Sequence, residues 1–155
     1  MPDGRISSPA GGLGAILVET GGRTITDMVA EAESRVATLS SAIRAYSAEQ
    51  VREILDIYRR GEVAMFTESR TVSTLAMNIA ETASVAHMTA LGEAARGICA
   101  MIDALIDDGV WHTEALAAHI NSLALLSRPE APGEKEAAPI IARLAALRAA
   151  VGITD

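Results

Sequence analysis

The sequence has very few aromatic residues and an excess of negative charge. Only 3% of its 155 residues are aromatic, and the net charge at pH 7 is −7. Nucleic-acid binding needs basic side chains for the phosphates, and single strands also need aromatic rings for stacking. We therefore expect no nucleic-acid partner. An acidic surface instead favours docking to a basic face of another protein.

Cysteine and long apolar runs are equally scarce. Cys99 is the only cysteine, which excludes an internal disulfide and is typical of a reducing compartment. No stretch reaches the roughly 18 uninterrupted apolar residues of a membrane-spanning helix. The N-terminal sequence MPDGR carries an acid and precedes no long apolar segment, unlike a secretory signal. The sequence thus predicts a cytoplasmic, soluble protein with no membrane partner.

The hydrophobic part of the sequence consists mainly of alanine and aliphatic residues. Half of the residues are hydrophobic, and alanine favours helix because it loses no side-chain entropy there. A chain of this length fits one domain. We expect an all-α fold, with a four-helix-bundle core and one or two flanking helices.

Composition along the chain predicts four segments. Residues 1–12 are rich in glycine, serine and proline, as in a flexible tail. Residues 13–127 are assigned to the helical bundle domain, and within them the apolar residues 13–18 form either a docking helical turn or a strand. Residues 128–137 form a Pro- and Glu-rich linker. Residues 138–152 are predicted to be a C-terminal helix packed on the bundle.

The segment 26–60 forms either one helix, with a kink, or two helices. Thr24 is a suitable N-cap with Asp27 near the helix dipole. Apolar residues then recur in steps of three and four, at Val29, Ala32, Val36, Leu39 and Ile43. Ser47-Ala-Glu-Gln50 matches a capping box, which would start a second helix. Glycines at 61, 109 and 152 are predicted to end helices.

Metal and cofactor motifs are missing from the sequence. There is no cysteine pair and no His-Glu-x-x-His, and none of the three histidines follows a glutamate at the Glu-x-x-His spacing. The glycines of residues 11–14 lack the dinucleotide-binding spacing, and no Gly-x-Ser-x-Gly is present. We expect no metal, no cofactor and no enzymatic activity.

The segment 77–92 (MNIAETASVAHMTALG) resembles the active segment of a histidine phosphotransfer domain. Phosphotransfer needs an exposed histidine, with a lysine and a small residue in the pattern His-x-x-Lys-Gly. In one alignment Met77, Ala80 and Glu81 take the places of that histidine, lysine and glycine. In the other alignment His87 takes the histidine's place, and Gly92 falls one residue late.

The first alignment preserves the downstream spacing better and predicts a catalytically silent domain. Met77, Asn78, Ala80 and Glu81 would then contribute to a partner-binding surface. The minority alternative is an active phosphotransferase that uses His87. It would need Arg96 or another distant cation to replace the missing lysine. A further acidic run, at Asp103, Asp107 and Asp108, is either a docking surface or a solvated face.

A second resemblance covers residues 13–127. The segments GGRTITDMVAEAESRV and TALGEAARGICAMIDALIDDGVWHTEALAAHINSLALL are similar to the small chemotaxis accessory proteins called CheE, found in alphaproteobacteria. This resemblance implies a cytoplasmic signalling accessory without assured catalytic residues. Its partner would be a response regulator or a histidine kinase. A structural helical protein that self-associates into a homo-oligomer is the remaining alternative.

Overall fold

The computed structural model describes residues 22–153, so the expectations for residues 1–12 and 13–18 lie outside the described residues. The chain divides into two units, residues 1–37 and residues 38–155. The predicted all-α class is confirmed, because the described residues contain helices and no strand. The elements are α2 (Ile25–Arg59), α3 (Glu62–Thr67), α4 (Ser69–Ala83), the short 3-10 helix η1 (Ser84–Ala86), α5 (Thr89–Asp108), α6 (Thr113–Leu126) and α7 (Glu134–Ala150).

The described part of the first unit is the beginning of α2. Thr24 caps it as predicted: the backbone N–H of Asp27 donates to Thr24 Oγ1 at 3.1 Å, and Thr24 N–H donates to the Asp27 carboxylate at 3.2 Å. Glu31 forms ion pairs with Arg35 one turn further along α2 and with Arg23, which precedes the helix. These exposed pairs support the helix locally and add little stability.

The segment 26–60 forms one helix and does not break at Ser47. The capping-box interpretation fails there because Ser47 lies inside α2 with only 1% of its surface exposed. From this residue onward the helix buries a regular stripe, including Val51, Ile54 and Ile57. Burial of that stripe favours uninterrupted helix over a new N-terminus.

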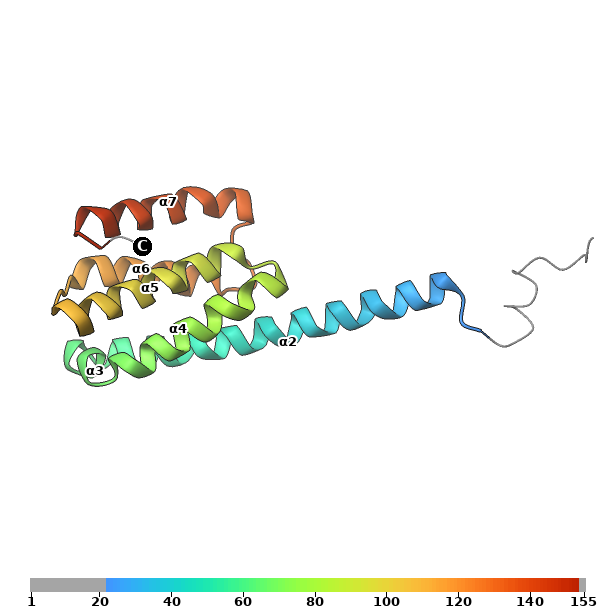
Figure 1. Cartoon of the computed structure of the whole chain (residues 1–155), viewed down its shortest axis with the longest axis horizontal. Helices are drawn as coiled ribbons and strands as arrows, with labels where there is room; N and C mark the ends of the chain where they lie inside the picture. Colours follow the sequence, from blue (N-terminus) through green and yellow to red (C-terminus); the bar gives the residue numbers. More distant parts are fainter. Residues whose placement is uncertain (1–21, 154–155) are drawn as a thin grey trace, which may run out of the picture. The chain divides into compact units, whose positions relative to one another are not determined.

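In the second unit, α5 is the central helix and contacts α4, α6 and α7 (Figure 1). Small residues let α4 and α5 approach closely. A Cβ added at Gly92 would lie 3.2 Å from the Cβ of Ala83 and 3.6 Å from the carbonyl oxygen of Ala80. Within the described residues, the core consists of alanine and aliphatic side chains together with Met65, Cys99 and Met101, and contains no fully buried aromatic ring.

Two of the four aromatic residues, Phe66 and Trp111, join α3 to the segment just before α6. The rings of Phe66 and Trp111 lie with centroids 4.3 Å apart. Glu62 accepts hydrogen bonds from the hydroxyl of Thr113 and from the indole N–H of Trp111. Those two hydrogen bonds, in that order, lower the pKa of the Glu62 carboxyl.

Three helices end just before the glycines that were predicted to terminate them. Gly61, Gly109 and Gly152 all have positive φ, at 96°, 67° and 81°. The last helix begins earlier than expected, however. α7 starts at Glu134, inside the expected 128–137 linker. The Glu136 carboxylate accepts a hydrogen bond from the backbone N–H of Gly133 at 3.1 Å, which is the half of a capping box that a glycine N-cap allows.

None of the described helices is long and apolar enough to cross a membrane.

Candidate docking surfaces

The residues proposed for partner binding lie on α4, but they do not share one exposed face. Met77 is 43% exposed, and Glu81, one turn later, is also exposed. Asn78 is half-buried, and its side-chain amide donates to Gln50 Oε1 of α2 at 3.3 Å. Ala80 is 3% exposed. Met77 and Glu81 are thus the members of this set that a partner can reach.

Ala80 is buried because α5 packs directly against it. Gly92 of α5 approaches the carbonyl of Ala80 so closely that any added Cβ would touch it. A phosphotransfer lysine must reach solvent beside its histidine. The position that aligns with this lysine is therefore committed to the helix–helix interface.

Met77 opens onto a groove of about 560 Å³ between α4, α5 and the residues Gly152 and Ile153, which follow α7. On α5 the groove is lined by Asp103, Asp107 and Asp108, all exposed. Arg96 also lines it and pairs with Glu93. The structure thus brings together two features that the sequence offered separately, the Met77 position and the acidic run. We call this surface the Met77 groove.

Cys99 lies in the wall of the Met77 groove and is unsuited to act as a nucleophile. Its side chain is 5% exposed, and its thiol donates to the carbonyl oxygen of Ser73 at 3.7 Å. Burial, together with the nearby negative charge of Asp103, raises the pKa of the Cys99 thiol to about 11. A thiol in this environment stays protonated at neutral pH and behaves as a small hydrophobic side chain.

His87 does not lie on a helix face, as a phosphotransfer histidine does. It ends the α4–η1 segment in the left-handed conformation, with φ 54° and ψ 42°. Its N–H donates to the carbonyl of Ser84 at 3.2 Å, and the N–H of Met88 donates to that of Ala83 at 2.9 Å. This pair of bonds is a Schellman motif, in which glycine usually occupies the position of His87.

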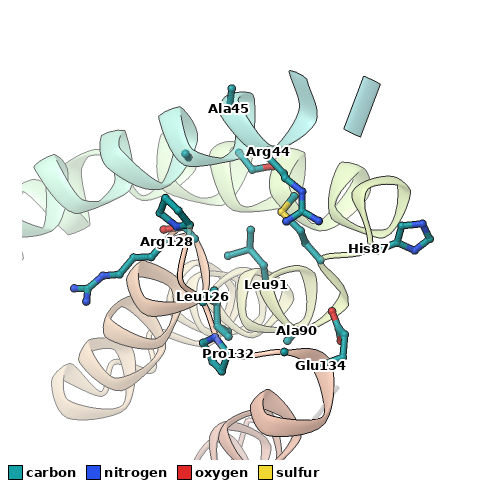
Figure 2. A pocket seen from close by; sticks show the side chains of 16 residues that line it. Arg44, Ala45, His87, Ala90, Leu91, Leu126, Arg128, Pro132 and Glu134 are labelled. Atoms are coloured by element: carbon teal, nitrogen blue, oxygen red, sulfur yellow. The ribbon is translucent and has the colours of Figure 1, made fainter. Parts of the chain in front are cut away.

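A second cavity, of about 710 Å³, adjoins the His87 turn. Its walls come from α2, from the start of α5 and from the segment between α6 and α7. Figure 2 shows His87 and Arg128 at opposite sides of this cavity, with their side chains directed away from its centre. Arg44 donates from its guanidinium to the carbonyl of Ala86 at 2.8 Å and so fixes the turn.

Arg96 was expected to assist His87, but the arginine found beside the His87 turn is Arg44. Arg96 lines the Met77 groove, whereas Arg44 and Arg128 line the cavity at the His87 turn. Arg44 could not be found from the sequence, because the rest of α2 and the helices α3 and α4 separate it from His87 along the chain. Within residues 22–153, no group of three or more His, Cys, Asp or Glu side chains is placed to hold a metal ion.

Comparison with known proteins gives no further guide to the function: the chain matches no family model, no curated protein and no solved structure. The CheE-like and phosphotransfer-like resemblances therefore stay predictions.

Proposed function

We propose that the protein is a non-enzymatic signalling module of a chemotaxis or two-component pathway, which docks a response regulator or a histidine kinase through the Met77 groove. Binding without phosphotransfer would let it compete for the regulator or hold it in reserve. The cytoplasm is the compartment in which such a partner would be met.

The observation that carries this proposal is the position of Met77 beside the acidic residues of α5. An exposed methionine offers a flexible apolar contact that adapts to a partner's surface. Asp103 and Asp107 add negative charge at the edge of the same groove. Apolar contact supplies affinity, and charge speeds the encounter with a basic partner face.

Two features support a silent module over an active phosphotransferase. The only lysine of the chain, Lys135, lies in the first turn of α7, and Ala80 occupies the buried place that aligns with the phosphotransfer lysine. His87 forms part of a turn, and the guanidinium of Arg44 is already bonded to the backbone of that turn. A phosphoryl group on His87 would have to compete for this arginine.

Direct binding measurements test the proposal. Response regulators and histidine kinases encoded beside the gene would be titrated against the protein by calorimetry. We expect one of them to bind, and Met77→Glu to weaken that binding at least tenfold. Val63→Glu is the matched control, because Val63 is 79% exposed and does not line the groove. Equal weakening by both variants would argue against docking at Met77.

Phosphotransfer is tested with the same proteins. The chain would be incubated with a phosphorylated regulator and with an autophosphorylated kinase, and labelled protein would be followed over time. We expect no label on the chain. Label that appears on wild type and disappears in His87→Gln would overturn the silent-module proposal, as would the absence of binding to every regulator and kinase tested.

A further inference from the structure

The first part of α2 carries an apolar stripe whose members, except the half-buried Ile43, are exposed to solvent. Its members follow each other in alternating steps of four and three residues, namely Ile25, Val29, Ala32, Val36, Leu39, Ile43 and Tyr46. Val36 is 58% exposed and Leu39 is 52% exposed. We call this set the α2 stripe. Large apolar side chains gathered on one helix face mark an interaction surface when they form a continuous row.

The same helix face is buried further along α2. Gln50, Ile54 and Ile57 continue the row after Tyr46, and they are between 0% and 9% exposed. The pattern of a core-facing helix therefore begins at Ile25, while burial begins only at Ser47. Helices in water depend on packing of their apolar face for most of their stability. Among residues 22–153, the α2 stripe is thus an apolar packing face that no other element covers.

The spacing of the α2 stripe favours a like helix as that covering. Alternating steps of four and three residues are the heptad pattern of a coiled coil, and the stripe extends for about three heptads. Its first core position is β-branched in each heptad, at Val29, Val36 and Ile43. The second core positions are Ile25, Ala32, Leu39 and Tyr46, so one of the four is leucine. β-branched residues at every first position favour two parallel strands, and Leu39 is the second-position residue that matches this preference.

The flanking residues permit this pairing without electrostatic repulsion. In a parallel pair the residue before each first core position meets the fifth residue further along the other helix. Arg35 then meets Ser40 of the second copy, and Met28 meets Glu33 of the second copy. No like charges face each other in these pairs.

We propose that the protein forms a parallel homodimer in which the α2 stripes of two copies pack as a short coiled coil. This inference does not rest on the proposed signalling function. If both hold, the dimer presents two Met77 grooves, and a dimeric partner would gain avidity from engaging both.

Sedimentation of the full-length chain tests the dimer. Between about 1 µM and about 100 µM, wild type should shift from monomer to dimer, and Leu39→Glu should raise the dissociation constant at least tenfold. Ser41→Glu is the matched control, because Ser41 is exposed on the opposite side of the same helix. Circular dichroism of both variants separates lost pairing from lost folding. A wild type that stays monomeric at the highest concentration overturns the proposal.

Cysteine cross-linking tests the register. In a parallel, in-register pair, residue 39 of one copy lies against residue 39 of the other. Leu39→Cys should therefore give a disulfide-linked dimer with oxidised glutathione, and Ser41→Cys should not. The buried Cys99, with its high thiol pKa, should not interfere. Cross-linking that is equal at both positions would contradict the stripe as the interface.

Removing residues 1–21 tests whether the N-terminal segment, and not a second copy of the chain, covers the α2 stripe. If the shortened chain dimerises and the full chain does not, the N-terminal segment covers the α2 stripe, and the homodimer proposal is wrong. If loss of the dimer in Leu39→Glu leaves binding at the Met77 groove intact, the two surfaces act separately. That result would leave the proposed function standing whatever the oligomeric state.

Discussion

His119 of α6 accepts a hydrogen bond from Arg148 of α7, with 3.2 Å between His119 Nε2 and the arginine Nη1. The other ring nitrogen, Nδ1, lies 2.8 Å from the carbonyl oxygen of Ala115 and must donate its proton to it. His119 is therefore neutral in the folded protein, with the proton on Nδ1. The histidine is completely buried, and Arg148 is 8% exposed.

The protein should become less stable as the pH is lowered, because the folded state holds His119 in its neutral form. Burial, and then the positive charge of Arg148, lower the pKa of His119 below its ordinary value of 6.5. The unfolded chain takes up a proton near pH 6.5 while the folded chain does not, so stability is complete above that pH. Below it, the free energy of unfolding should decrease by up to about 1.4 kcal/mol per pH unit, until the lowered pKa is reached.

Urea unfolding between pH 8 and pH 5 measures this effect in wild type and in His119→Gln. The variant should lose the part of the pH dependence that belongs to His119. His87→Gln, the same exchange at an exposed position, is the control. An identical pH profile for wild type and His119→Gln would contradict a neutral, buried His119.

Replacing Gly97 should destabilise the protein, because a glycine at this position leaves the space that His119 and Arg148 occupy. An added Cβ would lie 2.6 Å from the His119 ring and 2.6 Å from Arg148 Nη1. The end of the arginine can move, but the buried ring cannot. Gly97→Ala should therefore destabilise the protein by about 1 to 3 kcal/mol, despite the better helix propensity of alanine.

Thermal unfolding followed by circular dichroism measures that change. Gly133→Ala is the matched variant, because its Cβ would meet only a Glu136 carboxylate oxygen, at 3.9 Å. Because Gly133 is the N-cap of α7, where alanine is disfavoured, this variant should lose no more than about 1 kcal/mol. Equal melting temperatures for the two variants would show that the space around Gly97 is not restricted.

Restoring the phosphotransfer lysine should unfold the bundle instead of creating an active site. Ala80→Lys would place an ammonium group in the α4–α5 interface, at an expected cost of more than about 3 kcal/mol. Glu81→Lys, one residue later on the exposed side, should change stability by less than about 0.5 kcal/mol. Chemical denaturation of both variants gives the comparison, and a stable, fully folded Ala80→Lys would refute this packing.

His87→Gly should stabilise the protein. A residue with a Cβ in the left-handed conformation costs about 1 kcal/mol or more, and glycine avoids that cost. His87→Ala keeps a Cβ and should show no comparable gain, which makes it the matched control. If His87→Gly is no more stable than His87→Ala, the turn at His87 is not strained.

The features that could be predicted from the sequence depend on residues that are close to one another along the chain. The Thr24 cap and the helix ends at Gly61, Gly109 and Gly152 involve a few consecutive residues, whose hydrogen bonds and backbone freedom are local. The continuity of α2 through Ser47 could not be predicted in this way. A capping box competes there with burial of the helix face, and burial depends on the rest of the bundle.

The amino-acid sequence by itself determined an all-α chain, because its alanine and aliphatic residues recur at helical spacing and few alternatives satisfy that pattern. Only the tertiary structure decided which residues of α4 can reach a partner. It buried Ala80 against Gly92, left Met77 exposed beside Asp103, and joined His119 to Arg148. Such pairings depend on how closely two helices approach, and that distance is fixed by side chains far apart in the sequence.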